Sequence, residues 1–190
     1  MPQDVFEEYA DDYDRWFDEH RDEYLAELSR IRRVLPAPDS RSIEVGVGSG
    51  RFAEQLGIML GVEPSRALCR IARKRGIKLI QGKAEALLIK DDTCSSVLLV
   101  TVICYLDDPL AALCELHRIL FPQGVLIVAF IERGKQIHLK YLREGGKGLF
   151  LSHARFYSEE EVITSLEIAG FAVIEIDSRA GFCVIAARKD

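Results

Sequence analysis

Long apolar runs are missing from this sequence. The longest, at residues 97–106 and 125–131, are far shorter than the roughly 20 residues that a membrane-spanning helix needs. Residues 1–4 are followed by acidic residues instead of the basic region and apolar core of a secretory signal. We therefore expect no membrane span and no secretory leader, and we expect the protein in the cytoplasm.

A basic excess is also missing. The chain has 25 Lys and Arg against 30 Asp and Glu, for a formal net charge of -5, so it offers no overall footprint for duplex nucleic acid. The five cysteines form no C-x-x-C pair, and the four histidines are scattered without metal-ligand spacing. These absences predict no nucleic-acid partner, no disulfide framework and no metal site.

Short apolar runs alternate with amphipathic segments from residue 41 onward. The apolar runs predict strands at residues 42–45, 58–62, 77–81, 97–101 and 125–131. The segments between them predict helices at residues 50–56, 65–75 and 109–120. Strands and helices that take turns in this way predict right-handed βαβ units and a mostly parallel sheet, doubly wound with helices on both faces.

The last part of the chain predicts one more helix and a hairpin. Ser158 has Glu161 three residues later, the spacing of a capping box, and the helix that follows should end at residues 169–170. Apolar runs at 171–176 and 182–187 flank a polar stretch at 177–181 that ends in glycine. This pattern predicts a terminal antiparallel hairpin with its loop at 177–181.

Two segments stand apart from this alternation within the single domain that we expect over residues 1–190. Residues 1–35 have a helical pattern, and residues 4–27 hold eleven Asp or Glu against two Arg, with aromatic residues near helical spacing. This aromatic stripe packs on the domain or forms a helical lid over a ligand. Residues 133–157 lack a clear period and are basic, and we expect an insertion on the substrate side of the site.

Residues 43–52, Ile-Glu-Val-Gly-Val-Gly-Ser-Gly-Arg-Phe, are the most informative segment. Glycines at this predicted turn from strand to helix let a ligand approach the backbone. Arg51 stands where a dinucleotide fingerprint needs glycine, and no Gly-Lys-Ser/Thr of a P-loop follows. Glu63 ends the second predicted strand, at the sheet edge where open α/β folds bind ligands, and it can accept hydrogen bonds from two ribose hydroxyls.

Several ordered motifs together resemble the class I S-adenosylmethionine-dependent methyltransferases, in the small-molecule group of methyltransferase type 11 near the ubiquinone and menaquinone biosynthesis enzymes. The motifs are the glycine loop at 44–50, Glu63, the third-strand motif at 81–87, the turn at 120–124, the late helix start at 155–161 and a Y-D-x-W-F lead-in at 13–17. The resemblance covers almost the whole chain. It implies a Rossmann-like seven-stranded sheet of order 3-2-1-4-5-7-6 with the last strand antiparallel. It also implies S-adenosylmethionine as cofactor, S-adenosylhomocysteine as product and a small-molecule methyl acceptor.

The resemblance also assigns residues by position. Gly46 and Gly48 would lie against the methionine portion, Glu63 would hold the ribose, and the backbone at Thr101 would face the methionine ammonium. Lys83 departs from the family pattern, because relatives usually have Asp there to accept from the adenine amino group and lysine cannot accept. The full predicted set on the cofactor side is Glu44, Gly46, Gly48, Gly50, Glu63, Pro64, Ser65, Ala84, Glu85 and Thr101, with Ala84 and Glu85 at the adenine. Candidates for the acceptor side are Tyr9, Tyr13, Trp16, Cys104 and Tyr105.

No catalytic residue is predicted, because the cofactor carries an activated leaving group and the protein mainly has to align the reactants. The absence of an Asn/Asp-Pro-Pro-Tyr/Phe tetrapeptide near residue 101 counts against methylation of base amino groups or glutamine amides. The acidic N-terminal segment would suit a cationic amine as acceptor, whereas the basic residues 133–155 would suit an anion. Two other functions remain open: a non-catalytic module that binds S-adenosylmethionine or S-adenosylhomocysteine, and a nicotinamide-dependent oxidoreductase, which rests on fold analogy and conflicts with Arg51.

Overall fold

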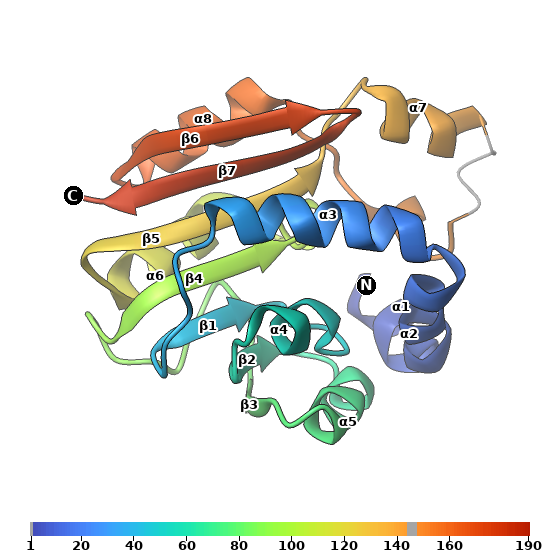
Figure 1. Ribbon diagram of the computed structural model, residues 1–190, viewed down its shortest axis with the longest axis horizontal. Helices are drawn as coiled ribbons and strands as arrows, with labels where there is room; N and C mark the ends of the chain where they lie inside the picture. The colour runs from blue at the N-terminus through green and yellow to red at the C-terminus, as the bar shows by residue number, and fades with distance from the viewer. Residues whose placement is uncertain (1, 144–147) are drawn as a thin grey trace.

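The computed structural model describes residues 2–143 and 148–190. Its sheet has seven strands in the order β3-β2-β1-β4-β5-β7-β6 (Figure 1). Neighbouring strands from β3 to β5 are parallel, and β7 runs antiparallel to both β5 and β6. The strand order and the antiparallel last strand are confirmed. The strands are β1 Ser42–Val45, β2 Leu60–Glu63, β3 Lys78–Gln81, β4 Cys94–Val100, β5 Leu120–Ile131, β6 Phe171–Arg179 and β7 Phe182–Lys189.

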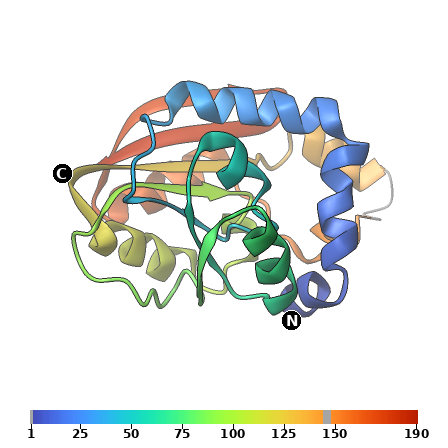
Figure 2. The same cartoon turned by 60° about the horizontal axis from the view of Figure 1, so that its bottom comes forward.

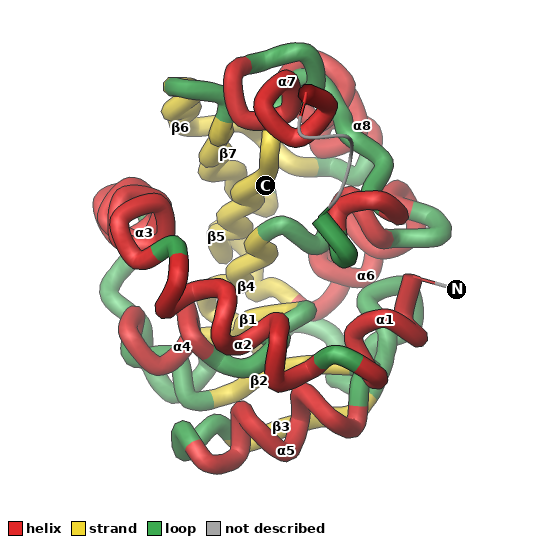
Figure 3. The backbone as a smooth tube through the Cα atoms, turned by 90° about the vertical axis from the view of Figure 1, so that its right-hand side faces the viewer, coloured by secondary structure: helices red, strands yellow, loops and turns green. Residues whose placement is uncertain are grey.

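Helices cover both faces of the sheet. They are α1 Pro2–Glu8, α2 Ala10–Glu19, α3 Arg21–Val34, α4 Arg51–Leu56, α5 Arg66–Lys74, α6 Pro109–Ile119, α7 Gln136–Arg143 and α8 Glu159–Ile168, with short 3-10 turns η1 Ile103–Tyr105 and η2 Leu151–His153. Figure 3 shows α3 and α4 on one side of the sheet and α6 and α8 on the other. Within the described ranges, no helix is both long enough and apolar enough to cross a bilayer.

Strand β4 is an example of a central strand with an apolar run, at residues 97–100, and its packing shows the reason for that run. Val97 and Leu99 pack in the cluster that includes α6 and α8, whereas Leu98 and Val100 pack in the cluster that includes α3 and α4. Successive side chains of a strand point to opposite faces, so a strand covered on both faces is apolar at successive positions instead of at alternate ones. All four residues are at most 5% exposed.

Local capping sets the starts of two helices, and the second of them was predicted from the sequence. Ser65 accepts a hydrogen bond from the Leu68 amide at the start of α5. At α8 both hydrogen bonds of the predicted capping box form between Ser158 and Glu161. Satisfying these free amides fixes where the chain turns from strand into helix.

The structure corrects the predicted loop of the terminal hairpin. Residues 177–179 belong to β6, and the turn consists of Ala180 and Gly181 alone, both with positive φ. Asp177 misled the prediction because it is polar but only 5% exposed. Its carboxylate is paired with the neighbouring Arg179 and with Arg30 and Arg33 of α3, and partners as distant in sequence as the latter two are not visible in the local pattern.

The two segments outside the alternation also differ in detail from expectation. The N-terminal segment is helical but consists of three helices, which break at Tyr9 and His20. The expected irregular stretch at 133–157 contains the helix α7, which was too short to show a clear period. Residues 144–147 of that stretch lie outside the described residues. Figure 2 shows α1, α2 and α7 gathered at the edge of the sheet where the parallel strands end.

Candidate functional site

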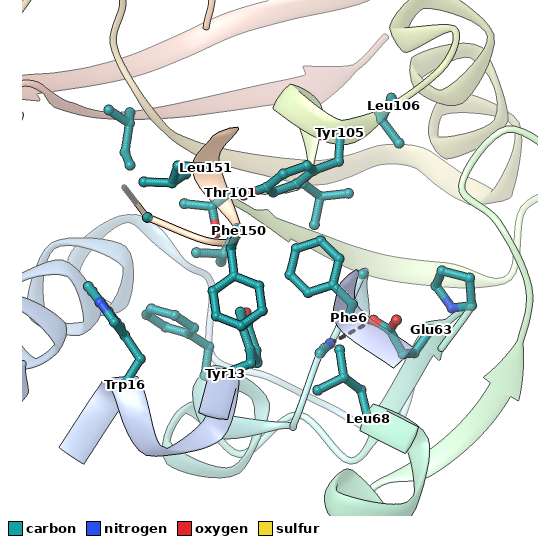
Figure 4. Close-up of a pocket in the computed structure, with 18 of the residues that line it drawn as sticks. Phe6, Tyr13, Trp16, Glu63, Leu68, Thr101, Tyr105, Leu106, Phe150 and Leu151 are labelled. Atoms are coloured by element: carbon teal, nitrogen blue, oxygen red, sulfur yellow. Dashed lines mark hydrogen bonds between the residues drawn. The ribbon is translucent and has the colours of Figure 1, made fainter. Parts of the chain in front are cut away.

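A cavity of about 390 Å³ opens at the carboxyl edge of the parallel strands. Its walls come from the turns after β1, β2, β3 and β4, from the three N-terminal helices, from α7 and from residues 148–151. Open α/β sheets bind ligands at this edge, and cavities of roughly 300–1,000 Å³ suit small molecules. Figure 4 shows the side chains that face this space.

The turn after β1 requires its glycines. Gly46 has φ +71°, and a Cβ there would lie 2.3 Å from Val102 Cγ2. Gly48 has φ +56°, and a Cβ there would lie 3.2 Å from the ring of Tyr13. A side chain at either position would meet both backbone strain and a close contact, so the loop presents bare backbone to the cavity.

Glu63 connects the glycine turn to the end of β2. One carboxylate oxygen accepts from the Gly48 amide at 2.9 Å and the other accepts from the Ser65 amide at 2.9 Å. Burial raises the pKa of Glu63 to about 7, although the hydrogen bonds from Ser65 and Gly48 act in the opposite direction. The carboxylate lies on the cavity wall (Figure 4), and its remaining lone pairs can accept from neighbouring hydroxyls of a ligand.

Two buried polar atoms beside the glycine turn lack a hydrogen-bond partner within the described structure. They are Oε2 of Glu44 and Oγ of Ser49. Burial raises the pKa of Glu44 well above its ordinary value, with a smaller contribution in the same direction from Glu63. An unsatisfied buried polar group costs roughly 1–3 kcal/mol, so a polar ligand group near this turn would be stabilising.

The end of β4 forms the next part of the wall. Thr101 has φ +51°, and its amide donates to the Ala129 carbonyl at 2.7 Å. Cys104 Sγ donates to the Thr101 carbonyl at 3.2 Å, and burial raises the pKa of this thiol to about 12. The Cys104 thiol therefore stays protonated at neutral pH, and Cys104 is not among the residues that line the cavity, whereas Tyr105 is.

Four aromatic rings close one side of the cavity. Phe6 meets Tyr13 and Tyr105 edge to face, with ring centroids 5.5 and 5.1 Å apart, and stacks on Phe150 at 5.4 Å. Figure 4 shows Phe6, Tyr105 and Phe150 above Leu68, with Tyr13 below Phe150. Phe6 and Phe150 were not predicted from the sequence, because neither belongs to a motif and only the fold brings them together.

An ion-pair network holds α2 against the glycine turn. Arg51 donates to both Asp14 and Asp18, and Arg75 donates to Asp14 and to the Ser49 carbonyl. Burial opposes ionisation of Asp14, but the hydrogen bonds from Arg51 and Arg75 outweigh it and lower its pKa to about 2. The network explains the Y-D-x-W-F lead-in, since Tyr13 contacts Gly48 while the neighbouring Asp14 anchors the helix.

The charged residues of the wall are mostly acidic. The only lysine or arginine among the described wall residues is Lys83, whose Nζ lies 3.4 Å from a carboxylate oxygen of Asp107. Glu85 stands close by and accepts from the Asp107 amide at 3.0 Å. Glu23 and Glu27 of α3 lie on the wall as well, and the sequence patterns did not predict them.

The structure brings most of the predicted site residues together. On the cofactor side, the wall contains Gly46, Gly48, Glu63, Pro64, Ala84, Glu85 and Thr101, and on the acceptor side it contains Tyr13, Trp16 and Tyr105. The other predicted residues are not among those that line the cavity: Glu44, Gly50, Ser65, Tyr9 and Cys104. Ser65 and Gly50 act behind the wall, as the start of α5 and the residue before α4.

Comparisons with known proteins agree with this geometry. The family described as "Methyltransferase domain" matches residues 43–128. A solved S-adenosylmethionine-dependent methyltransferase from Thermotoga maritima, described as a possible histamine N-methyltransferase, is 37% identical with a TM-score of 0.92, and each chain is covered completely. A solved S-adenosylmethionine-dependent methyltransferase from Mesorhizobium loti shares the fold at 18% identity, with a TM-score of 0.71 over 86% of this chain and 98% of its own.

Two further relatives are known as sequences. An uncharacterized protein from Methanocaldococcus jannaschii is 37% identical over 90% of this chain and 82% of its own length. An uncharacterized protein from Mycobacterium tuberculosis is 32% identical over 85% of this chain. The match spans only 58% of that mycobacterial protein.

Proposed function

The chain belongs to the S-adenosylmethionine-dependent methyltransferases, and from this premise we propose that it transfers the cofactor's methyl group to a small molecule held in the cavity. The observation that carries the proposal is the composition of that one cavity. Its wall combines the glycine turn and Glu63 with aromatic side chains from both ends of the chain. A cofactor on the first group and an acceptor on the second would share one enclosed space.

The residues present fit this cofactor. S-adenosylmethionine, when bound, supplies a methyl group on a positively charged sulfur that is an activated leaving group. The backbone of Gly46 and Gly48 would hold the methionine portion, and Glu63 would accept from the ribose hydroxyls. Two observations support the fit: Gly46 and Gly48 line the cavity with backbone alone, and Glu63 on the wall keeps lone pairs free after accepting from the Gly48 and Ser65 amides.

The chain's own contribution to the chemistry is alignment and exclusion of water. The rings of Phe6, Tyr13, Tyr105 and Phe150 cover the cavity. Burial raises the pKa of Tyr13 and of Tyr105 well above the ordinary value, so both hydroxyls stay protonated at neutral pH and can donate a hydrogen bond but cannot act as bases. We assign to the N-terminal helices and to residues 133–157 the role of a roof over the acceptor.

Titration calorimetry tests the cofactor assignment. The protein should bind S-adenosylmethionine and S-adenosylhomocysteine but not NAD. Glu63→Gln should weaken both adenosyl ligands by about 10- to 100-fold, because a hydrogen bond to a charged group contributes roughly 1.5–3 kcal/mol. Glu160→Gln is the matched control, since Glu160 is exposed on α8 and outside the cavity wall, and it should leave both affinities unchanged.

Other results would point to other functions. Selective binding of NAD would contradict the proposal and favour an oxidoreductase. Tight adenosyl binding without transfer to any compound in a broad acceptor panel would favour a non-catalytic binding module. The panel should include amines, because the relative from Thermotoga maritima is described as a possible histamine N-methyltransferase.

A further inference from the structure

We propose that the methyl acceptor is an organic amine and that Glu27 selects it by binding an ammonium group of the acceptor inside the cavity. This inference rests on the proposed function and adds the substrate class and a specificity-determining residue to it. It is carried by the position of Glu27, by the charge of the wall and by the aromatic side chains around it.

Glu27 lies on the cavity wall without a partner. It stands on α3 one turn after Glu23, and both side chains reach the wall. The Glu23 carboxylate is paired with Lys140 Nζ at 3.0 Å and its side chain is 48% exposed. The Glu27 carboxylate, by contrast, makes no hydrogen bond or ion pair with any other residue in the described part of the chain.

The nearby arginine on the same helix does not neutralise Glu27. The guanidinium of Arg30 donates to the Asp177 carboxylate and to the carbonyl oxygens of Asp177, Arg179 and Phe182. Burial raises the pKa of Glu27 to about 8, the charge of Glu23 adds to this, and Arg30 acts in the opposite direction. The Glu27 carboxyl is therefore mostly protonated at neutral pH in the empty site, and a cation bound in the cavity would lower its pKa and favour the ionised form.

The charge of the wall decides between the two acceptor classes that the sequence left open. Its acidic residues are Glu23, Glu27, Glu63 and Glu85, and its basic residue among those described is Lys83, which already faces Asp107. Three of the described basic side chains that follow β5 are already in ion pairs: Arg133 with Glu161 and Lys135 with Glu132, outside the wall, and Lys140 with Glu23, which lies on the wall. An anionic acceptor would therefore meet a negative wall, whereas a cation is favoured.

Aromatic side chains complete the site for an amine. Trp16, Phe17 and Tyr141 line the same cavity as Glu27. Aromatic faces attract cations and also pack against flat or alkyl groups. An arylalkylamine or alkylamine would place its body among these rings and its ammonium on Glu27. The nitrogen has to lose one proton before it can take the methyl group, and the Glu27 carboxylate can accept that proton, while the methyl donor leaves as neutral S-adenosylhomocysteine.

Three probes of similar size separate charge from shape: 3-phenylpropylamine, 3-phenylpropan-1-ol and 3-phenylpropionate. Each is titrated by calorimetry into protein saturated with S-adenosylhomocysteine, so that no turnover occurs. The amine should bind more tightly than the alcohol, and the anion most weakly. Glu27→Gln should weaken the amine by about 10- to 100-fold, as expected for loss of a charge-assisted hydrogen bond, and change the alcohol by less than about twofold.

Asp22→Asn is the matched control on the same helix. Because its carboxylate is exposed and outside the cavity wall, this change should alter amine affinity by less than about threefold. The proposal is overturned if the wild-type protein binds alcohol or anion as well as amine, if Glu27→Gln weakens alcohol as much as amine, or if none of the probes binds. Binding of S-adenosylhomocysteine is measured first in every variant, and its absence would refute the proposed function itself.

Discussion

Gly46→Ala tests whether the glycine turn is fixed by the end of β4. Two costs follow from the structure. The residue has φ +71°, which costs a non-glycine residue roughly 1–2 kcal/mol. The new Cβ would also lie 2.3 Å from Val102 Cγ2 and 3.0 Å from Cγ1, and overpacking of this kind costs typically 1–3 kcal/mol. We expect the free energy of unfolding to fall by about 2–5 kcal/mol in total.

Gly57→Ala separates these two costs. Gly57 has φ +79°, and no atom lies within 4 Å of the position that a Cβ would take. The substitution there should therefore show the backbone cost alone, about 1–2 kcal/mol. Urea unfolding followed by circular dichroism at constant pH gives the free energy of unfolding for each variant, provided that the slope with denaturant is unchanged.

Val102→Ala should rescue Gly46→Ala, because it removes both methyl groups that the new Cβ would meet. A double-mutant cycle should give a coupling energy of about 1–3 kcal/mol in favour of the pair. Equal costs at Gly46 and Gly57, together with no coupling to Val102, would refute the reasoning that close packing fixes this turn.

Three further predictions concern charged groups. The pKa of Asp14 is lowered in the folded state to about 2, so its contribution to stability is complete above its ordinary pKa and is lost as the pH falls toward 2. Urea unfolding should therefore show that the free energy of unfolding falls less between pH 4 and pH 2 in Asp14→Asn than in wild type. Because the pKa of Glu63 is raised to about 7, affinity for S-adenosylhomocysteine should fall as the pH drops from 8 to 5.5 and the carboxyl becomes protonated. If calorimetry finds that the affinities of wild type and Glu63→Gln change with pH in the same way, this prediction is contradicted. Asp177→Asn should lower the free energy of unfolding by about 2 kcal/mol, because it removes the negative charge that pairs with the guanidinium groups of Arg30, Arg33 and Arg179. A decrease below about 0.5 kcal/mol would show that these ion pairs do not stabilise the fold.

The sheet could be predicted from the sequence because the residue patterns that specify its strands and turns are local. Each central strand is a short apolar run, and the glycine turn and Glu63 lie within 20 residues of each other. The cofactor side of the cavity is built from such segments. Propensity and periodicity are sufficient where every part of a pattern is close in sequence.

The acceptor side could not be predicted in the same way. Phe6 and Phe150 are ordinary apolar residues until the fold stacks their rings. Glu27 belongs to an acidic segment that resembles a solvated helix face, and only the tertiary structure distinguishes it from its neighbours by placing it in a cavity. Asp177 was assigned to a loop for the same reason, because its arginine partners on α3 are distant in the chain.

The cavity described above is assembled from two unequal sources, and this has an evolutionary consequence. One uninterrupted stretch of the chain, from the glycine turn to η1, supplies the cofactor side, and it falls inside the matched family region at residues 43–128. The other wall comes from α1 to α3, from α7 and from residues 148–151, which lie outside that region. Under the proposed function, mutations in these flanking segments that keep Tyr13 and Asp14, which hold α2 against the glycine turn, can change what is methylated without disturbing the residues proposed to bind the methyl donor. Chimeras that exchange the two flanks between relatives should therefore inherit the acceptor preference of the flanks and keep the cofactor affinity of the central segment.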